Sequence, residues 1–461
     1  MKIKYIGSSL LLFLFFGLSP LVFCQEEAPP VGQVMEAILT QAAEKLARRE
    51  YAQALELFDT LPPEYAQDTQ IRILRAGICN SAGRPAEAKK IANEIIASNK
   101  NNIDALMILA DAAMIENKER ERRQFLESVI KIDAKHARAL IDLANINLKN
   151  QNLRVAGNYF DRAIAAEPEN GEALVGRASV HRYSKEFKKA EGLLNRAVRL
   201  YPDWARPLQE RARIYKSAGF NADALEDFAA AIKLEPDNYW VLVDYGTLLM
   251  ETNQKKAALE YLNRAIKISP NSFIAYVYSA AIKDELGDYA GAEKDYIVLT
   301  KLKPDYYFGF EALGIIRMRN KQWALARDSF LDAYKQAPKE FNYAILASIN
   351  WMRAGKQADP KQFLAQVIKT APRDSLDRAM LTLFHDLKGD ADVGIKVEAE
   401  KNNYEKTKML YFLASYYDIR GNKTIADKYF LMAKDLNAVG SLEWRLNEIM
   451  LTERGINLKD K

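Results

Sequence analysis

The sequence repeats itself at a fixed spacing of 34 residues. The clearest marker is a recurring proline, found at Pro168, Pro202, Pro236, Pro270, Pro304, Pro338 and Pro372. The six residues that end at the first of these, AIAAEP, return as AVRLYP, AIKLEP and AIKISP at the next three. A period of this length means that one supersecondary unit has been copied many times. The 461 residues are therefore not expected to divide into domains of ordinary size.

The residues between the prolines keep the same spacing. Numbering each repeat from 1 to 34 and starting one at Ala137, places 4, 8, 20, 24 and 27 are Leu140, Ala144, Ala156, Phe160 and Ala163. The next repeat has Leu174, Ala178, Ala190, Leu194 and Ala197 at these places. The pattern predicts two amphipathic helices of about 13 residues each, joined by a short turn. Small residues at places 8 and 20 would let the helices approach closely. Proline would follow the second helix because it has no backbone N–H to donate.

Composition favours helices throughout the chain. There are only 21 glycines and 15 prolines, 28% of the residues are charged, and Ala, Leu, Lys and Glu dominate long stretches. We therefore predict an all-α fold. The formal charge is +5, with basic and acidic residues interleaved. Nucleic-acid-binding proteins usually concentrate basic residues on one face or tail, so this balance argues against such a partner.

The repeat resembles the tetratricopeptide repeat, whose unit has this length, this helix–turn–helix plan and a similar series of Leu, small, aromatic, Ala and Pro positions. The resemblance implies a right-handed superhelical solenoid of about twelve 34-residue helix–turn–helix repeats.

The strength of the pattern varies along the chain and defines the expected organisation. A signal peptide over 1–24 and a short linker over 25–34 would precede a solenoid over 35–440. Repeats are strong over 137–340 and degenerate over 341–406, where Pro360 replaces a central alanine and the sequence is about two residues short. A recognisable unit returns over 407–440, and 441–461 reads as a C-terminal capping helix and tail that cover the apolar edge of the last repeat.

The first 24 residues have the layout of an export signal, with Lys2 and Lys4 before an apolar run and acidic residues after it. An uncleaved membrane anchor over 6–23 is the alternative, and both interpretations place the remaining chain outside the cytoplasm. Cys24 either precedes the cleavage site or carries a lipid, although Phe23 is larger than a bacterial lipobox prefers. The chain is thus expected to be periplasmic or envelope-associated, with a lipid anchor at Cys24 as one option. Cys79 reads as a buried free thiol.

The sequence offers no arrangement typical of an enzyme or a metal site. Its three histidines are not at ligand spacing, and it has no glycine-rich phosphate loop, serine nucleophile elbow or Cys/His signature. We expect a non-enzyme without cofactor or metal. An enzyme would require a site hidden in the degenerate stretch 341–406.

The resemblance implies that partners bind the concave surface formed by the first helices, at places 2, 5, 6, 9, 12 and 13 of each repeat. We call this surface the inner face. Its expected basic part contains Arg182, Arg206, Arg213 and Lys216. Its expected apolar part contains Trp240, Val243, Ile274, Val277, Tyr278, Phe308, Ile315, Ile345, Leu346, Ile349 and Met352, with Asp244, Asp284, Glu285 and Glu311 around it. Apolar side chains gathered in one groove would suit an extended or helical peptide with apolar anchors.

These observations favour a scaffold that binds a protein or peptide in the bacterial cell envelope. The alternative is a carrier that uses the apolar part of the groove to hold a lipid or small ligand. Self-association through the groove or the terminal repeats is a further option. The identity of the partner does not follow from the sequence.

Overall fold

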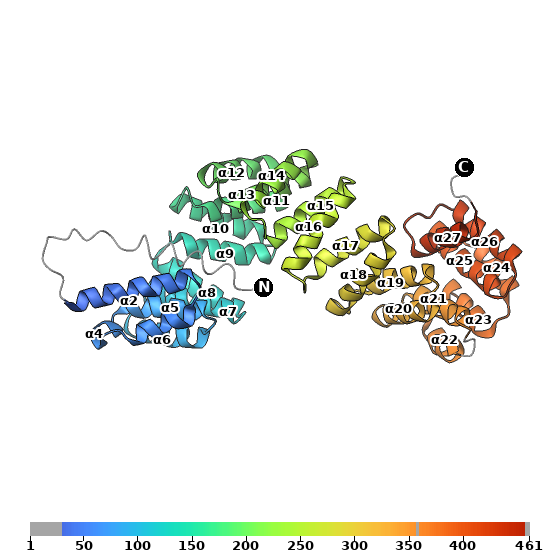
Figure 1. Cartoon of the computed structure of the whole chain (residues 1–461), viewed down its shortest axis with the longest axis horizontal. Helices are drawn as coiled ribbons and strands as arrows, with labels where there is room; N and C mark the ends of the chain where they lie inside the picture. Colours follow the sequence, from blue (N-terminus) through green and yellow to red (C-terminus); the bar gives the residue numbers. More distant parts are fainter. Residues whose placement is uncertain (1–29, 356–358, 457–461) are drawn as a thin grey trace. The chain divides into compact units, whose positions relative to one another are not determined.

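The computed structural model describes residues 30–355 and 359–456, and all regular secondary structure in these two stretches is helical (Figure 1). The all-α prediction is confirmed. The proposed signal peptide and Cys24 lie outside the described residues. No helix within the described part has both the length and the apolar character needed to cross a membrane. The chain forms two compact units, an N-terminal unit that ends at Glu235 and a C-terminal unit that begins at Pro236.

The N-terminal unit consists of consecutive helices in which neighbours along the chain pack against each other. They are α2 (Pro30–Ala47), α3 (Tyr51–Asp59), α4 (Pro63–Ala66), α5 (Thr69–Ser81), α6 (Pro85–Ser98), α7 (Ile103–Ile115), α8 (Glu119–Ile132), α9 (Ala137–Lys149), α10 (Leu153–Ala166), α11 (Gly171–Tyr183), α12 (Phe187–Leu200), α13 (Ala205–Ala218) and α14 (Asn221–Leu234).

The C-terminal unit continues the same plan. Its helices are α15 (Tyr239–Glu251), α16 (Lys255–Ile268), α17 (Phe273–Glu285), α18 (Tyr289–Leu302), α19 (Tyr307–Arg319), α20 (Trp323–Gln336), α21 (Phe341–Arg353), α22 (Asp359–Thr370), α23 (Leu376–Asp386), α24 (Asp390–Ala399), α25 (Asn403–Ile419), α26 (Lys423–Asp435) and α27 (Leu442–Glu453). The paired helices of each strong repeat match the predicted length, as α9 has 13 residues and α10 has 14.

The predicted repeat positions form the core between paired helices. All five diagnostic residues of the repeat that starts at Ala137 are fully buried, as are those of the following repeat. The small residue at place 8 is needed for this packing. A Cβ atom added to Gly314 would lie 2.7 Å from Phe330 Cζ, closer than atoms in contact allow. The backbones of α19 and α20 can therefore approach only where a side chain is absent or very short.

A left-handed residue ends the first helix of each repeat and sets the turn to the second. Positive φ angles recur every 34 residues, at Arg49, Gly83, Asn117, Gln151, Lys185, Gly219, Asn253, Gly287, Lys321, Gly355 and Gly389. At the end of α13, the N–H of Phe220 donates to the carbonyl of Tyr215 over 2.8 Å, as in a Schellman cap. The next such glycine is Gly421, 32 residues after Gly389, so the degenerate stretch is two residues short in the backbone as well.

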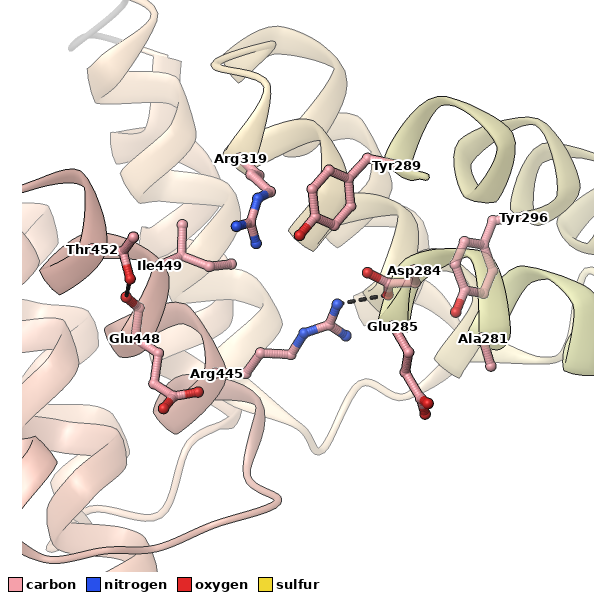
Figure 2. A pocket seen from close by; sticks show the side chains of 10 residues that line it. All are labelled: Ala281, Asp284, Glu285, Tyr289, Tyr296, Arg319, Arg445, Glu448, Ile449 and Thr452. Carbon is pink, nitrogen blue, oxygen red and sulfur yellow. Dashed lines mark hydrogen bonds and ion pairs between the residues drawn. The ribbon is translucent and has the colours of Figure 1, made fainter. Parts of the chain in front are cut away.

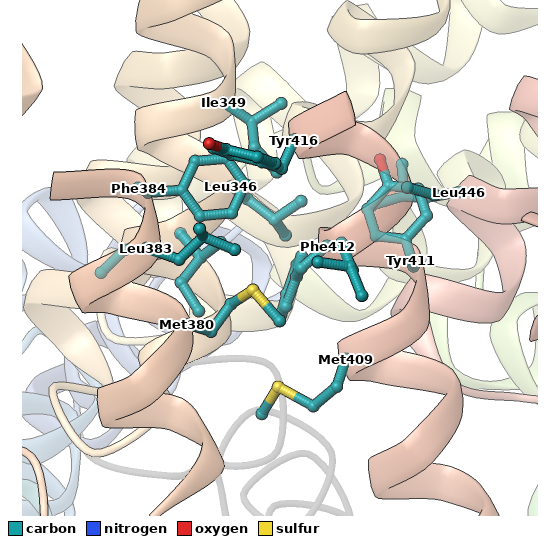
Figure 3. Packing of buried hydrophobic residues seen from close by; sticks show 14 of the residues in the cluster. Leu346, Ile349, Met380, Leu383, Phe384, Met409, Tyr411, Phe412, Tyr416 and Leu446 are labelled. Carbon is teal, nitrogen blue, oxygen red and sulfur yellow. The ribbon is translucent and has the colours of Figure 1, made fainter. Parts of the chain in front are cut away.

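The degenerate stretch forms shorter helices, with 12 residues in α22, 11 in α23 and 10 in α24. Pro360 is the second residue of α22, within the first turn, where a backbone N–H has no intrahelical acceptor. Its position explains how the repeat tolerates proline in place of the expected alanine. Figure 3 shows that α21, α23, α25 and α27 contribute side chains to one continuous core, including Leu346, Phe384, Phe412 and Leu446.

The C-terminal helix α27 is firmly embedded in the C-terminal unit. Leu446, Asn447 and Leu451 are buried, and the Asn447 side-chain amide donates to the carbonyl of Phe430 over 3.0 Å. Helix α27 therefore packs on the last repeat, at α25 and α26. It also reaches further back along the chain, because Glu443 accepts a 3.1 Å hydrogen bond from Asn342 of α21.

We predict opposite effects for two Gly→Ala substitutions in the N-terminal unit. An added Cβ would meet nothing within 4 Å at either Gly219 or Gly192, so packing is not involved. Gly219 has a φ of 85°, and Gly219→Ala should lower the free energy of unfolding by about 1 kcal/mol through backbone strain. Gly192 lies inside α12, and Gly192→Ala should raise the free energy of unfolding by about 1 kcal/mol through helix propensity. Urea denaturation followed by circular dichroism measures both. A loss at both sites would contradict the assigned turn.

We also predict that Glu443 makes the stability of the C-terminal unit pH-dependent. Burial raises the pKa of this carboxyl from its ordinary value near 4.5 to about 7, against the opposing effect of its hydrogen bond from Asn342. The folded state thus prefers protonated Glu443. Protonation of Glu443 therefore contributes fully to the free energy of unfolding below pH 4.5. This contribution falls as the pH rises toward 7 and is absent above pH 7, a change of at most about 3 kcal/mol.

Glu443→Gln should remove this dependence, because the amide stays neutral. The variant should be more stable than wild type at pH 8 and similar to it at pH 4.5, as measured by thermal unfolding across this range. Glu453→Gln changes an exposed carboxyl of the same helix and is the matched control. Parallel pH profiles for wild type and Glu443→Gln would contradict the prediction.

Candidate functional site

The three predicted arginines of the N-terminal unit already lie beside carboxylates of the same chain. Arg206 pairs with Glu172, and Arg213 pairs with Glu210. The guanidinium of Arg182 lies 3.9 Å from Glu210 and 4.4 Å from the ring centre of Tyr183. Lys216 is half-buried. A partner would therefore meet arginines whose charge is partly balanced, and the proposed role of these four residues in binding stays a prediction.

Among the predicted inner-face residues of the C-terminal unit, two aromatic side chains stand out by their exposure. Trp240, at place 2 of α15, is 46% exposed, and Phe308, at place 2 of α19, is 49% exposed. Ile274 occupies the same place in α17 and is half-buried. Neighbouring rings support the two aromatic residues, since the ring centres of Tyr239 and Trp240 are 5.0 Å apart and those of Tyr307 and Phe308 are 4.2 Å apart.

The other predicted inner-face residues are more enclosed. Val243 and Ile315 are buried, each with 3% exposure, so they offer almost no surface to a partner, contrary to their expected place on an open groove. Val277, Tyr278 and Asp244 are half-buried. Glu311 accepts a hydrogen bond from the Tyr343 hydroxyl, but burial outweighs this bond and raises the pKa of the carboxyl.

The apolar groove does not continue along α21. Ile345, Leu346 and Ile349 were expected to line it, but all three are fully buried and Met352 is nearly so. The reason is that α21 contacts α23 and α25 as well as its own partner helix. These contacts cover the face that a regular repeat would leave open. The residues belong to the core of the C-terminal unit.

A cavity of the C-terminal unit lies between α27 and the helices α17, α18 and α19. It measures about 400 Å³, and Figure 2 shows its lining. We call it the inner-face pocket. Its walls are formed by Ala281, Asp284, Glu285, Tyr289, Tyr296, Arg319, Arg445, Glu448, Ile449 and Thr452.

Charged groups of both signs line the inner-face pocket. Asp284 of α17 and Arg445 of α27 form an ion pair across it, 2.6 Å between carboxylate oxygen and guanidinium nitrogen. Arg319 stacks on the ring of Tyr289, with 4.2 Å between the guanidinium carbon and the ring centre. Burial raises the pKa values of Glu448 and Tyr296. The pocket is thus a polar site with aromatic walls.

The sequence pointed to one wall of this pocket but not to the other. Asp284 and Glu285 occupy inner-face places 12 and 13 of their repeat and were expected there. Arg445 was missed because it lies 161 residues after Asp284, in a helix expected only to cover the last repeat. No periodic signal connects the two positions.

Two further findings concern reactive groups. Cys79 is a buried free thiol, as predicted, and burial raises its pKa. Within residues 30–355 and 359–456, no cluster of His, Cys, Asp and Glu side chains has an arrangement that could hold a metal ion.

Comparisons with known proteins find solved structures and family profiles that are similar to parts of this chain. One similar solved structure is that of PilW, a widely conserved type IV pilus biogenesis factor. The two proteins are 18% identical, the match covers 46% of this chain and 98% of PilW, and the TM-score is 0.42. PilF of Pseudomonas aeruginosa shows 19% identity, 44% and 92% coverage, and a TM-score of 0.39. YrrB, a tetratricopeptide repeat protein with an unusual peptide-binding site, shows 21% identity, 41% and 95% coverage, and a TM-score of 0.35. A search of curated proteins finds no match. Residues 141–203 and 217–282 match family profiles described as tetratricopeptide repeat, and these segments identify repeats of that kind in the chain.

Proposed function

We propose that this protein is a non-catalytic scaffold that holds a protein or peptide partner on the inner face of its C-terminal unit, in the bacterial cell envelope. Tetratricopeptide repeats in general bind protein or peptide partners, and the two matched segments support this class of function. The signal-like layout of residues 1–24 supports export.

The observation that carries the proposal is the exposure of Trp240 and Phe308 at the same place of their repeats. Large aromatic side chains held half in solvent by neighbouring rings are typical anchors of protein interfaces, where they bury much surface at a small cost in side-chain entropy. The half-buried Ile274 occupies the same place in the repeat between them. The three residues suit a peptide that brings apolar side chains at matching intervals.

The inner-face pocket does not favour the alternative of a lipid carrier. Its walls carry an ion pair, a second arginine and two more carboxyl groups, and lipid chains would desolvate these groups without pairing them. Native mass spectrometry of the purified full chain distinguishes the two functions. A carrier would retain a small molecule that adds a constant mass to the protein, whereas a scaffold would show the mass of its polypeptide alone.

Partner capture tests the scaffold directly. We expect crosslinking in the native envelope to capture a protein partner with wild type and to lose it, by tenfold or more, with Trp240→Ala/Phe308→Ala, because two anchors of about 1–2 kcal/mol each are removed. Mass spectrometry of the crosslinked bands is the readout.

The matched control is Leu286→Ala/Leu325→Ala. It removes two similarly exposed apolar side chains of the same unit, at 42% and 45% exposure, that lie in a turn and on a second helix. Circular dichroism should show equal helicity for all three chains. Equal capture by the aromatic variant and wild type would reject Trp240 and Phe308 as the anchors of the partner.

A further inference from the structure

The ion pair across the inner-face pocket is asymmetric. The Asp284 side chain is 6% exposed, whereas the Arg445 side chain that pairs with it is 40% exposed. A nearly buried carboxylate therefore receives its compensating charge from an arginine that reaches it from the solvent side. Arg445 is the ionic partner that the structure gives to Asp284.

A buried carboxyl group that stays ionised requires a cation. Leaving such a group ionised and unpaired costs much more than an exposed ion pair contributes, because desolvation is not compensated. Asp284 therefore needs a positive group in this place but does not need that group to be Arg445. Any cation that reaches the carboxylate through the open side of the pocket would satisfy it.

Exchange of the cation requires little rearrangement. Helix α27 is held by Leu446, Asn447 and Leu451, all buried, and none of these contacts depends on the guanidinium of Arg445. Figure 2 shows the Arg445 side chain extending from α27 toward Asp284. Rotation of this one side chain would uncover the carboxylate while the helix stays in place.

The remaining walls suit a long basic side chain. The Tyr289 ring already carries a stacked guanidinium, that of Arg319, which demonstrates that aromatic walls of this pocket accept such a group. Ile449 and Ala281 offer apolar surface for a methylene stem, and Glu448 adds a carboxyl group to the walls. The carboxylate of Glu285 is already paired with Lys255, 2.8 Å away. A volume of about 400 Å³ is ample for one arginine or lysine side chain.

We propose that the inner-face pocket is a binding site for a basic side chain, arginine or lysine, of a peptide partner, and that Arg445 holds the place of that side chain in the unliganded chain. The proposal rests on the proposed function, since it names one chemical requirement of the peptide that the inner face holds. Binding exchanges one ion pair for another, so Asp284 acts as a specificity determinant.

The test uses the full-length chain and N-acetyl-L-arginine amide as the probe, with binding measured by isothermal titration calorimetry. Arg445→Ala removes the competing side chain. This variant should bind the probe at least about tenfold more tightly than wild type, because an internal competitor lowers the apparent affinity of the intact chain. Arg445→Met retains the stem and should behave in the same way, which covers the case in which the alanine variant folds poorly.

Three controls isolate the ion pair. The citrulline analogue of the probe has the same shape without charge and should not bind Arg445→Ala. Asp284→Asn in the Arg445→Ala background should abolish binding of the arginine probe. Arg420→Ala removes an exposed arginine elsewhere in the unit and should leave the affinity at the wild-type level.

Equal binding of the two probes, or binding that survives Asp284→Asn, would overturn the proposal. The result is independent of the capture experiment. If the probe binds and the aromatic variant still captures the partner, the pocket is supported and the aromatic anchors are rejected. If the probe does not bind and the aromatic variant loses the partner, the pocket alone is rejected.

Discussion

The close approach of two helices within one repeat is the interaction on which the rest of this structure depends. A single amphipathic hairpin of 13 and 14 residues cannot bury its apolar surface alone, and it becomes stable only when another hairpin covers it. Small residues at places 8 and 20 permit the first contact, and the large residue at place 24 fills the space beside it. Every described repeat with this pattern packs its two helices in the same way, which explains why nearly the same residues recur in the sequence.

The inner face follows from this packing. Side chains at places 2, 5, 6, 9, 12 and 13 of the first helix point away from the hairpin core, so they are free to vary in chemistry between repeats. In the C-terminal unit this freedom yields exposed aromatic rings on α15 and α19, a buried acid on α17 and a fully covered apolar surface on α21. The same places of the repeat thus have three different environments within a few repeats.

The parts of the fold that depend on local periodicity were predictable from the sequence. Helix lengths, the buried residues at the diagnostic places and the two-residue shortening all follow from spacing, because each repeat folds against its neighbours by the same rule. The closing of α27 onto earlier helices was not predictable. The Asp284–Arg445 pair joins residues 161 positions apart, and the burial of Ile345 and Ile349 depends on the contacts of α21 with α23 and α25. Sequence patterns identify the inner face of a helix but not what comes to lie over it.

The residues at the left-handed turns give the chain an uneven resistance to local opening. Three successive turns of the N-terminal unit use Asn117, Gln151 and Lys185, whereas Gly219, Gly287, Gly355 and Gly389 supply most of the later ones. Each non-glycine residue in this conformation costs about 1 kcal/mol, and sites this far apart contribute independently. A protease that probes transient opening would therefore find its first cuts around the non-glycine turns. The turn residues thus make local stability differ between repeats whose helical cores are nearly identical.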